Sequence, residues 1–388
     1  MSKVLLAVVL TVCVAGVHVT VTAQRAGGAA QPQPFKGMTA DGTIEPGLFP
    51  IKATGVSTRP VRESAQRFLQ TLTEDQRTKT TYAVDDDEWL KWNNVHRYAR
   101  QGVTFAEMSD AQRERGFDLM RASLSAKGFE RSRAVMKLND HLADLLNRHD
   151  EYGEWLYHLT VMGAPSDTEP WGWQLDGHHL IVNYFVLGDQ VVMTPTFMGS
   201  EPVTATEGRY AGTSVMQDEQ NKGLAFMRAL SDEQRAAAII QATKTANVPL
   251  AHAFRDNVEM PYVGLPGARL TVGQRTMLIE LIGEYLGNMA DGHAKVRMEE
   301  VRSQLDRTHF AWAGGMGNND VFYYRIHSPV ILIEFDHQSP VALQGTRGVP
   351  TRAHIHSVVR TPNGNDYGKD LLRQHYEKHK HDVAHGHR

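Results

Sequence analysis

Two histidines separated by one residue are the first feature of this chain that could carry chemistry. His354-Ile355-His356 opens a segment, His354 to Val359, that is short and β-branched and therefore predicts a strand. Because side chains alternate between the faces of a strand, this spacing puts both imidazoles on one face. Two imidazoles on one face form half of a common zinc, copper or iron site. The alternative to metal binding is a pair of ordinary surface or buried histidines that only form hydrogen bonds.

A second histidine pair, Gly177-His178-His179, lies just before a predicted strand that begins at Leu180. Adjacent residues in an extended strand point to opposite faces, so at most one of this pair should join the first pair. A turn at Gly177 is the exception, because it could aim both side chains the same way. The candidate metal ligands are therefore His178, His179, His354 and His356. Zinc is the expected metal because it accepts His and carboxylate ligands without redox demands, and copper or iron is the alternative.

Two further side chains are candidates for catalysis. Glu334 stands near the end of an apolar run, where a carboxylate is costly unless it is paired, hydrogen-bonded or metal-bound. It is a candidate ligand or general base, although the strand could simply emerge into water at this point. Arg325, between Tyr324 and Ile326, could bind an anionic substrate with its planar guanidinium, or could form a structural ion pair instead.

The helices that must position these residues are predicted from a short sequence pattern that recurs along the chain. An apolar residue, Ser or Thr, two further residues and Gln-Arg occur together four times, with the Ser or Thr at Thr73, Ser109, Ser231 and Thr271. This is the capping box, so it predicts four helix starts. Predicted strands are Leu180 to Val186, Val191 to Thr194, Tyr323 to Ile326, Val330 to Phe335 and His354 to Val359. Helices and strands come in blocks, which favours an α+β fold.

The blocks also indicate an internal duplication. Trp173-Gln174-Leu175 lies 151 residues before Tyr324-Arg325-Ile326, and Leu180-Ile181-Val182 lies at the same offset before Ile331-Leu332-Ile333. Self-similarity at a fixed offset is the mark of a repeated unit. We therefore predict a first α+β half over 59–210 and a second over 211–370. Each half would be a helical segment followed by short, mostly antiparallel strands.

The two ends of the chain predict export and a short tail. Lys3 and the apolar run Val4 to Val17 lead to small residues before Gln24, which indicates a signal peptide over 1–23, the alternative being a membrane anchor. A flexible lead-in over 24–58 and a His-rich tail over 371–388 complete the predicted organisation. We expect a periplasmic or secreted protein that has no membrane association after cleavage.

Composition excludes several kinds of site. Cys13 is the only cysteine and falls within the predicted signal peptide, so the mature chain would have no disulfide and no thiolate metal ligand. The net charge of −3 argues against a general polyanion-binding surface, so no nucleic-acid partner is expected. A small-molecule substrate or ligand is the expected partner, and the sequence leaves the oligomeric state open.

Several of these segments together resemble one protein family. They are Trp171 to Leu180, Thr194-Pro195 with Met198-Gly199, Tyr323 to Ile326, His354 to Ser357, and Asn365 to Gly368 with His375-Tyr376. In combination they are similar to the family known as domain of unknown function 3500, over roughly Val61 to Tyr376. The resemblance implies exported bacterial proteins of one fold and gives no reaction. All four candidate histidine ligands fall within the similar segments.

Two functions follow as hypotheses. The first is a metal-dependent hydrolase with a His and carboxylate site, in which a metal-bound water becomes a nucleophile near neutral pH. The second is a non-catalytic periplasmic protein that holds a small ligand in a cleft between the two similar halves. The residues expected to line that cleft are Trp171, Trp173, Tyr323, Tyr324 and Arg325.

Overall fold

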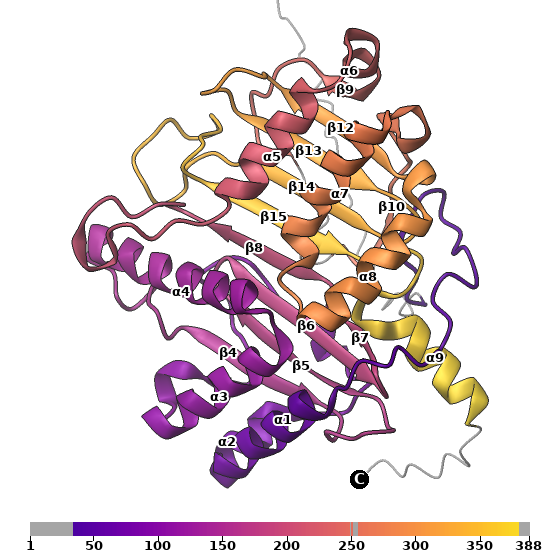
Figure 1. Ribbon diagram of the computed structural model, residues 1–388. Coiled ribbons are helices and arrows are strands. Elements are labelled where there is room, and N and C mark those ends of the chain that lie inside the picture. The colour runs from indigo at the N-terminus through magenta and orange to yellow at the C-terminus, as the bar shows by residue number, and fades with distance from the viewer. Residues whose placement is uncertain (1–33, 249, 251–254, 380–388) are drawn as a thin grey trace, which may run out of the picture. The chain divides into compact units, whose positions relative to one another are not determined.

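Among the residues that the structure describes, a mixed sheet of 13 strands positions the candidate site residues (Figure 1). The computed structural model describes residues 34–248, 250 and 255–379. The predicted signal peptide over 1–23 lies outside the described residues, as do the start of the predicted lead-in and the last residues of the predicted tail. Residues 35–388 fall in one unit, so both predicted halves contribute to the same sheet.

The central strands follow the order β12-β13-β14-β15-β8-β6-β5-β4, and each is antiparallel to its neighbours. These strands are β4 (Tyr157–Met162), β5 (Trp171–Gly177), β6 (Leu180–Leu187), β8 (Thr196–Ser200), β12 (His309–Gly314), β13 (Phe322–His327), β14 (Leu332–His337) and β15 (Ile355–Arg360). Shorter strands complete the sheet: β2 (Thr81–Tyr82), β3 (Val103–Thr104), β7 (Gln190–Val192), β9 (Ile239–Gln241) and β11 (Leu265–Pro266). A separate parallel pair joins β1 (Gly37–Thr39) to β10 (Asn257–Glu259).

All four predicted helix starts are confirmed. Thr73, Ser109, Ser231 and Thr271 are N-caps with complete capping boxes. The helices are α1 (Arg59–Thr71), α2 (Glu74–Thr80), α3 (Asp110–Ser123), α4 (Ala126–Leu146), α5 (Gln217–Arg228), α6 (Asp232–Ala238), α7 (Val272–Leu286), α8 (Asp291–Ser303) and α9 (Lys369–Lys378). Together with the sheet they confirm the predicted α+β class. Among the described residues, no helix is both long and apolar enough to cross a membrane.

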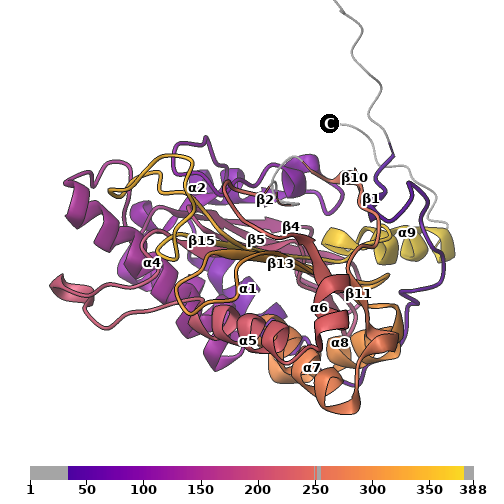
Figure 2. The ribbon, with the colours of Figure 1, turned by 90° about the horizontal axis from the view of Figure 1, so that it is seen from above.

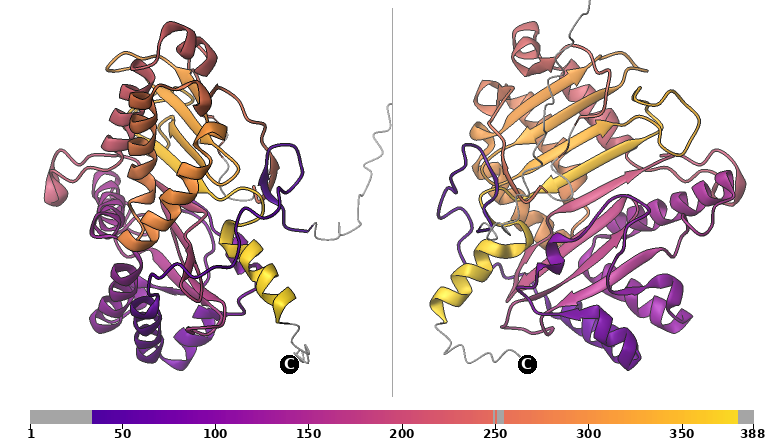
Figure 3. Two further views of the ribbon diagram at one scale, coloured as in Figure 1. Left: turned by 45° about the vertical axis from the view of Figure 1, so that its right-hand side comes forward. Right: turned by 180° about the vertical axis from the view of Figure 1, so that it is seen from behind.

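Both faces of the sheet are covered, which explains the nearly continuous apolar runs in its strands. Along β6, Val182, Tyr184 and Val186 pack into the larger core, and Ile181 and Phe185 pack into a second one. The larger core lies under α1, α3, α4, α5, α7 and α8, and Figure 2 shows α5, α7 and α8 together on one side. The second core takes Leu371 and Leu372 from α9, which lies on the opposite side in Figure 3.

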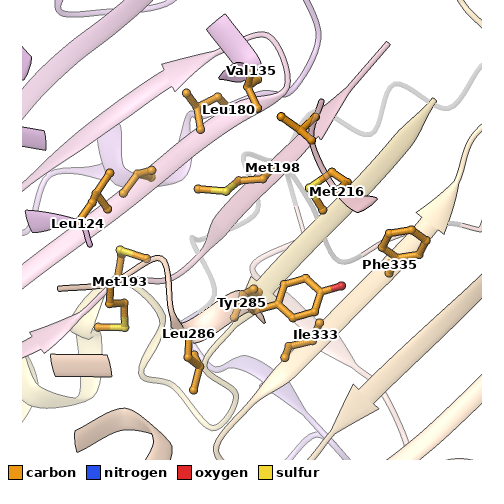
Figure 4. Close-up of a cluster of buried hydrophobic side chains, with 14 of the residues drawn as sticks. Leu124, Val135, Leu180, Met193, Met198, Met216, Tyr285, Leu286, Ile333 and Phe335 are labelled. Atoms are coloured by element: carbon orange, nitrogen blue, oxygen red, sulfur yellow. The ribbon is translucent and has the colours of Figure 1, made fainter. Parts of the chain in front are cut away.

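Side chains from both predicted halves mix in the larger core. Figure 4 shows Leu180 and Met198 in one apolar cluster with Tyr285 and Ile333. The strand β8 also pairs with β15 over five residues, from Thr196 opposite Val359 to Ser200 opposite Ile355. The boundary between the predicted halves is thus a continuous seam of hydrogen bonds and packed side chains.

The two runs β4-β5-β6-β8 and β12-β13-β14-β15 have the same strand order. Val161 pairs with Trp173, which pairs with Tyr184. Each partner 151 residues later is paired in the same way, Trp312 with Tyr324 and Tyr324 with Phe335. This likeness of register accords with the offset in the sequence. The duplication itself stays a prediction.

Candidate metal centre

Three buried histidines bring one ring nitrogen each to a common point. The Nε2 atoms of His179 and His356 are 3.0 Å apart, those of His354 and His356 are 2.9 Å apart, and those of His354 and His179 are 3.3 Å apart. All three side chains are buried. We call these three residues the His triad.

Two elements that are far apart in the sequence build the triad. His354 and His356 flank the start of β15, where the alternation of the strand puts both on the same side. His179 occupies the two-residue turn between β5 and β6, and its φ of 61° lies in the left-handed region that non-glycine residues rarely adopt. The strand β8 lies between β6 and β15 and holds the turn and the strand side by side (Figure 1).

Gly199 makes this close approach feasible. It pairs with His356 across the strands, and its N–H donates to the carbonyl of His179 at 2.9 Å. A Cβ at position 199 would lie 2.3 Å from the carbonyl oxygen of Ile355 and 3.3 Å from the ring of His356. Because position 199 has no side chain, β8 can pair with His356 on β15 and at the same time bind the backbone of His179 in the turn.

Hydrogen bonds alone cannot satisfy the three Nε2 atoms. A neutral imidazole nitrogen either bears a hydrogen or offers a lone pair, so two of any three such nitrogens must be of the same kind. At 2.9–3.3 Å, at least one contact in the triad would then be repulsive. A cation at the centre would instead attract one lone pair from each of the three nitrogens, and no Nε2 would need a hydrogen-bond partner. Zinc–nitrogen bonds of 2.0–2.1 Å at tetrahedral angles place neighbouring nitrogens about 3.3 Å apart. The triad could therefore hold a metal ion.

The surroundings of His179 and His354 keep these two imidazoles in the neutral form that binds metals. Burial lowers the pKa of His179 well below its usual value, and the neighbouring imidazoles of His178, His356 and His354 lower it further. Burial also lowers the pKa of His354, although the nearby Glu201 carboxylate and the Ser339 carbonyl act in the opposite direction. At neutral pH both of these rings are uncharged.

His354 is oriented by contacts on its far side. Its Nδ1 lies 2.8 Å from the carbonyl oxygen of Ser339, which can only accept, so Nδ1 bears the hydrogen and Nε2 offers its lone pair to the triad. Glu201 lies 3.6 Å from the same Nδ1. Its carboxylate accepts hydrogen bonds from the backbone amides of Val341 and Ala342 at 3.0–3.2 Å. Glu201 thus fixes the loop after β14 beside the triad.

A cavity of about 120 Å³ opens beside the triad. Besides the triad, its lining residues are Asn94, Val95, His96, Tyr152, His178, Glu201, Val341 and Ala342. A bound ion would therefore face open space on one side and protein ligands on the other.

His178 lies beside the triad without contributing a nitrogen to it. Its ring stacks on that of His179 with centroids 4.0 Å apart. Its Nδ1 lies 2.7 Å from Oδ1 of Asn139, whose Nδ2 donates to the carbonyl of Gly153 at 2.9 Å. The amide therefore accepts from Nδ1–H and leaves the lone pair on Nε2 of His178.

The two predicted catalytic residues lie on neighbouring strands, outside the described cavity lining. Glu334 is buried in β14 and accepts a hydrogen bond from the hydroxyl of Tyr323 at 2.6 Å. Arg325 in β13 pairs with Glu334 in register. Asp336, two residues further along β14, lies opposite His356 but carries an ion pair with Lys244 at 2.9 Å.

Sequence patterns did not identify several residues of the site. His96, Tyr152, Glu201 and Ser339 lie in loops and Asn139 lies in α4, so only the packing of these segments around the sheet brings them to the triad. The one available signal was the position of Glu201 directly after a short apolar strand that contains Met198-Gly199. Of the predicted cleft residues, Trp171, Trp173 and Tyr324 are fully buried in the larger core.

The fold and site together define an α+β protein with a buried three-histidine centre at the seam of one large sheet. A family model described as "Protein of unknown function (DUF3500)" matches residues 54–369, and the chain belongs to this family. Comparisons with curated proteins and with solved structures gave no match.

Proposed function

We propose that this protein is a metal-dependent hydrolase whose ion is held by His179, His354 and His356. The observation that carries the proposal is the convergence of three Nε2 atoms within 3.3 Å of one another, in an arrangement that hydrogen bonds cannot satisfy. We propose zinc as the ion because all three ligands are neutral imidazoles and the site requires no redox change. Copper or iron is the alternative.

Three protein ligands beside a cavity favour a catalytic role over a structural one. Structural zinc sites close the ion with four protein ligands, whereas catalytic sites keep one position open for water or substrate. The cavity of about 120 Å³ lies where that open position would be. A bound ion of this kind lowers the pKa of its water to near 7 and so supplies a nucleophile at neutral pH.

The residues of the chain contribute positioning and exclusion of bulk water. Ser339 fixes the ring of His354 through its carbonyl, and the turn between β5 and β6 fixes His179. Glu201 holds the loop after β14 against the site through backbone amides. Val95 and Tyr152 close other parts of the wall.

A ligand-binding role between the predicted halves has less support. The cavity on the helix side of the β8–β15 seam has a volume of about 20 Å³, enough for about one water molecule. It is lined by side chains from both predicted halves, including Met198 and Tyr285. A small organic ligand would need this core to open, whereas the triad cavity is already formed.

Elemental analysis of purified full-length protein tests the proposal. We expect about one zinc per chain, and loss of that zinc in a His354→Ala/His356→Ala variant that keeps its thermal unfolding transition. His149→Ala is the control because its side chain is half exposed and lies outside the site. Ions that the C-terminal histidines bind loosely would be present in every variant, so they would not change the difference in zinc content between the wild type and a variant. Equal metal content in the double variant and the wild type would refute the centre.

We also propose export to the periplasm or beyond the cell, which the N-terminal residues support. The triad uses no thiolate, so it is compatible with an oxidising compartment. Comparison of the N-terminal residue of the protein purified from whole cells and from the periplasmic fraction tests this proposal. A chain that still begins at Met1 in the cytoplasmic fraction alone would contradict it.

A further inference from the structure

The described walls of the triad cavity offer no cationic side chain to a ligand, and the oxygens of their one carboxylate already accept hydrogen bonds. Among the described lining residues there is no lysine or arginine. Glu201 is the one carboxylate in the lining, and its oxygens already accept hydrogen bonds from the amides of Val341, Ala342 and Leu343. An anionic group that entered the cavity would leave water without a cationic side chain to pair with, and a cationic group would be repelled by the bound metal ion, so either entry is costly.

The cations near the cavity are also engaged. Arg97 and Arg148 both form ion pairs with Glu151. Arg100 is buried against Asp176 at 3.1 Å and donates to the carbonyl of Val95 at 2.6 Å, so it holds one wall in place. An anionic substrate such as a phosphate ester would therefore find the metal ion and no second cation.

The edge of the cavity is apolar on two sides. Val95 is 44% exposed and Val341 is 63% exposed, which makes them two of the few large apolar side chains of the described residues at the surface. They come from segments far apart in the sequence, yet both line this one cavity. Single exposed valines are ordinary, but two at the edge of the same cavity form a surface that an apolar group can cover.

Resting on the proposed function, we infer that the substrate is a small uncharged ester or amide with an apolar acyl group. Val95 and Val341 are then the residues that determine specificity. In the reaction the acyl C–O or C–N bond breaks, the water oxygen bonds to the acyl carbon, and the proton of the water leaves with the alcohol or amine. The volume of about 120 Å³ restricts the part of the substrate inside the cavity to a short acyl group.

A binding experiment tests this inference without relying on turnover. The full-length chain is loaded with Co²⁺, whose visible spectrum reports each ligand that reaches the ion. Three hydroxamic acids share one metal-binding head and differ in the tail: butyrohydroxamic acid, β-alanine hydroxamic acid and malonic monohydroxamic acid. We expect the butyryl compound to bind about tenfold more tightly than either charged compound, because the described lining offers no cationic side chain to the carboxylate tail and the bound metal ion repels the ammonium tail.

Substitutions at the edge should change this order. Val341→Lys is expected to weaken butyrohydroxamate about tenfold and to strengthen the malonyl compound by a similar factor, since the new ammonium group can pair with the carboxylate tail. Val95→Lys tests the other exposed valine of the lining independently. Val349→Lys is the matched control, because Val349 is 52% exposed in the same loop and is absent from the described lining.

The outcomes separate the two proposals. The expected order of tails, changed by both cavity variants and not by Val349→Lys, supports the inference. A cobalt spectrum that responds equally to all three tails overturns the inference and leaves the metal centre standing. A chain that takes up no cobalt overturns both.

Discussion

Buried imidazoles have contrasting surroundings in the part of the chain that the structure describes. His337 has a hydrogen-bond partner at each ring nitrogen, the Phe322 backbone at Nδ1 and Oε1 of Gln220 at Nε2. The triad nitrogens face one another. His327 is buried in β13 with no hydrogen-bond partner at either ring nitrogen. It therefore stays neutral without any polar contact that would compensate for its burial.

His327 predicts a loss of stability in acid. Burial lowers its pKa from 6.5 to about 3. Below pH 6.5 the unfolded chain therefore binds a proton at His327 that the folded chain does not bind. The contribution of the neutral His327 to stability is complete above pH 6.5 and is lost as the pH falls below it. Between pH 7.5 and pH 5 the loss is about 2 kcal/mol. His327→Phe should abolish that part of the loss, as measured by urea unfolding at both pH values.

The half-exposed His149 provides the control for this measurement. His149→Gln should follow the wild type at both pH values, because its side chain is 54% exposed and gains little from folding. Equal acid sensitivity of His327→Phe and the wild type would show that other buried groups dominate.

At the scale of single residues, local spacing predicted only part of the site. The grouping of His354 with His356 follows from the alternation of a strand. The burial of Glu334 follows from the apolar run before it, but its partner, the Tyr323 hydroxyl, depends on the pairing of β13 with β14. Ser339 acts through its backbone carbonyl, which every residue possesses, so no residue type could have indicated it.

At the scale of elements, the short strand β8 decides whether the triad can form. Gly199→Ala would place a methyl group 2.3 Å from the Ile355 carbonyl and would push β8 away from β15. We expect a loss of roughly 1–3 kcal/mol in unfolding free energy, the usual range for an overpacked site, and a loss of metal affinity of at least about tenfold. Isothermal titration with zinc measures the affinity.

Gly273→Ala is the matched control for this change. It lies in the exposed first turn of α7, and a Cβ there would meet no atom within 4 Å. It should leave zinc affinity unchanged and should stabilise the chain slightly, since alanine favours a helix. Wild-type zinc affinity in Gly199→Ala would mean that the triad tolerates displacement of β8.

The capping boxes explain why helix starts were the most accurate sequence prediction. Thr or Ser and Gln satisfy backbone groups of their own helix, so the signal is wholly local. Their glutamines do more than that pattern predicts. Gln112 donates to Gln76 at 2.7 Å, and Gln274 donates to Gln234 at 2.7 Å. These contacts join α3 to α2 and α7 to α6, and they depend on packing that local spacing does not encode.

At the scale of the whole molecule, the shared sheet and core predict one unfolding transition. Glu219 of α5 is fully buried and forms an ion pair with Arg131 of α4, so it joins the two predicted halves on the helix side. We expect β5 and β13 to lose hydrogen-exchange protection at the same urea concentration. Glu219→Gln should lower both urea midpoints together and the free energy of unfolding by roughly 2–4 kcal/mol, because it removes the closer of the two buried carboxylates that pair with Arg131, the other being Glu284 at 4.0 Å.

Glu233→Gln serves as the comparison for Glu219→Gln. The Glu233–Arg269 ion pair is exposed, so its loss should change the stability by less than about 1 kcal/mol. Loss of protection in β13 while β5 stays protected would show that the predicted halves unfold independently.

The positions of the triad along the chain bear on when the ion can enter. A ribosome releases residues in order, so the stretch up to position 353 carries just one of the three ligands, His179. The pair that completes the centre emerges only after β14 and the loop that Glu201 holds. The run β4-β5-β6-β8 is therefore synthesised before the ligand pair, and an ion held by all three histidines could bind only after synthesis has passed His356. Fragments released by premature termination before His354 would lack the centre altogether.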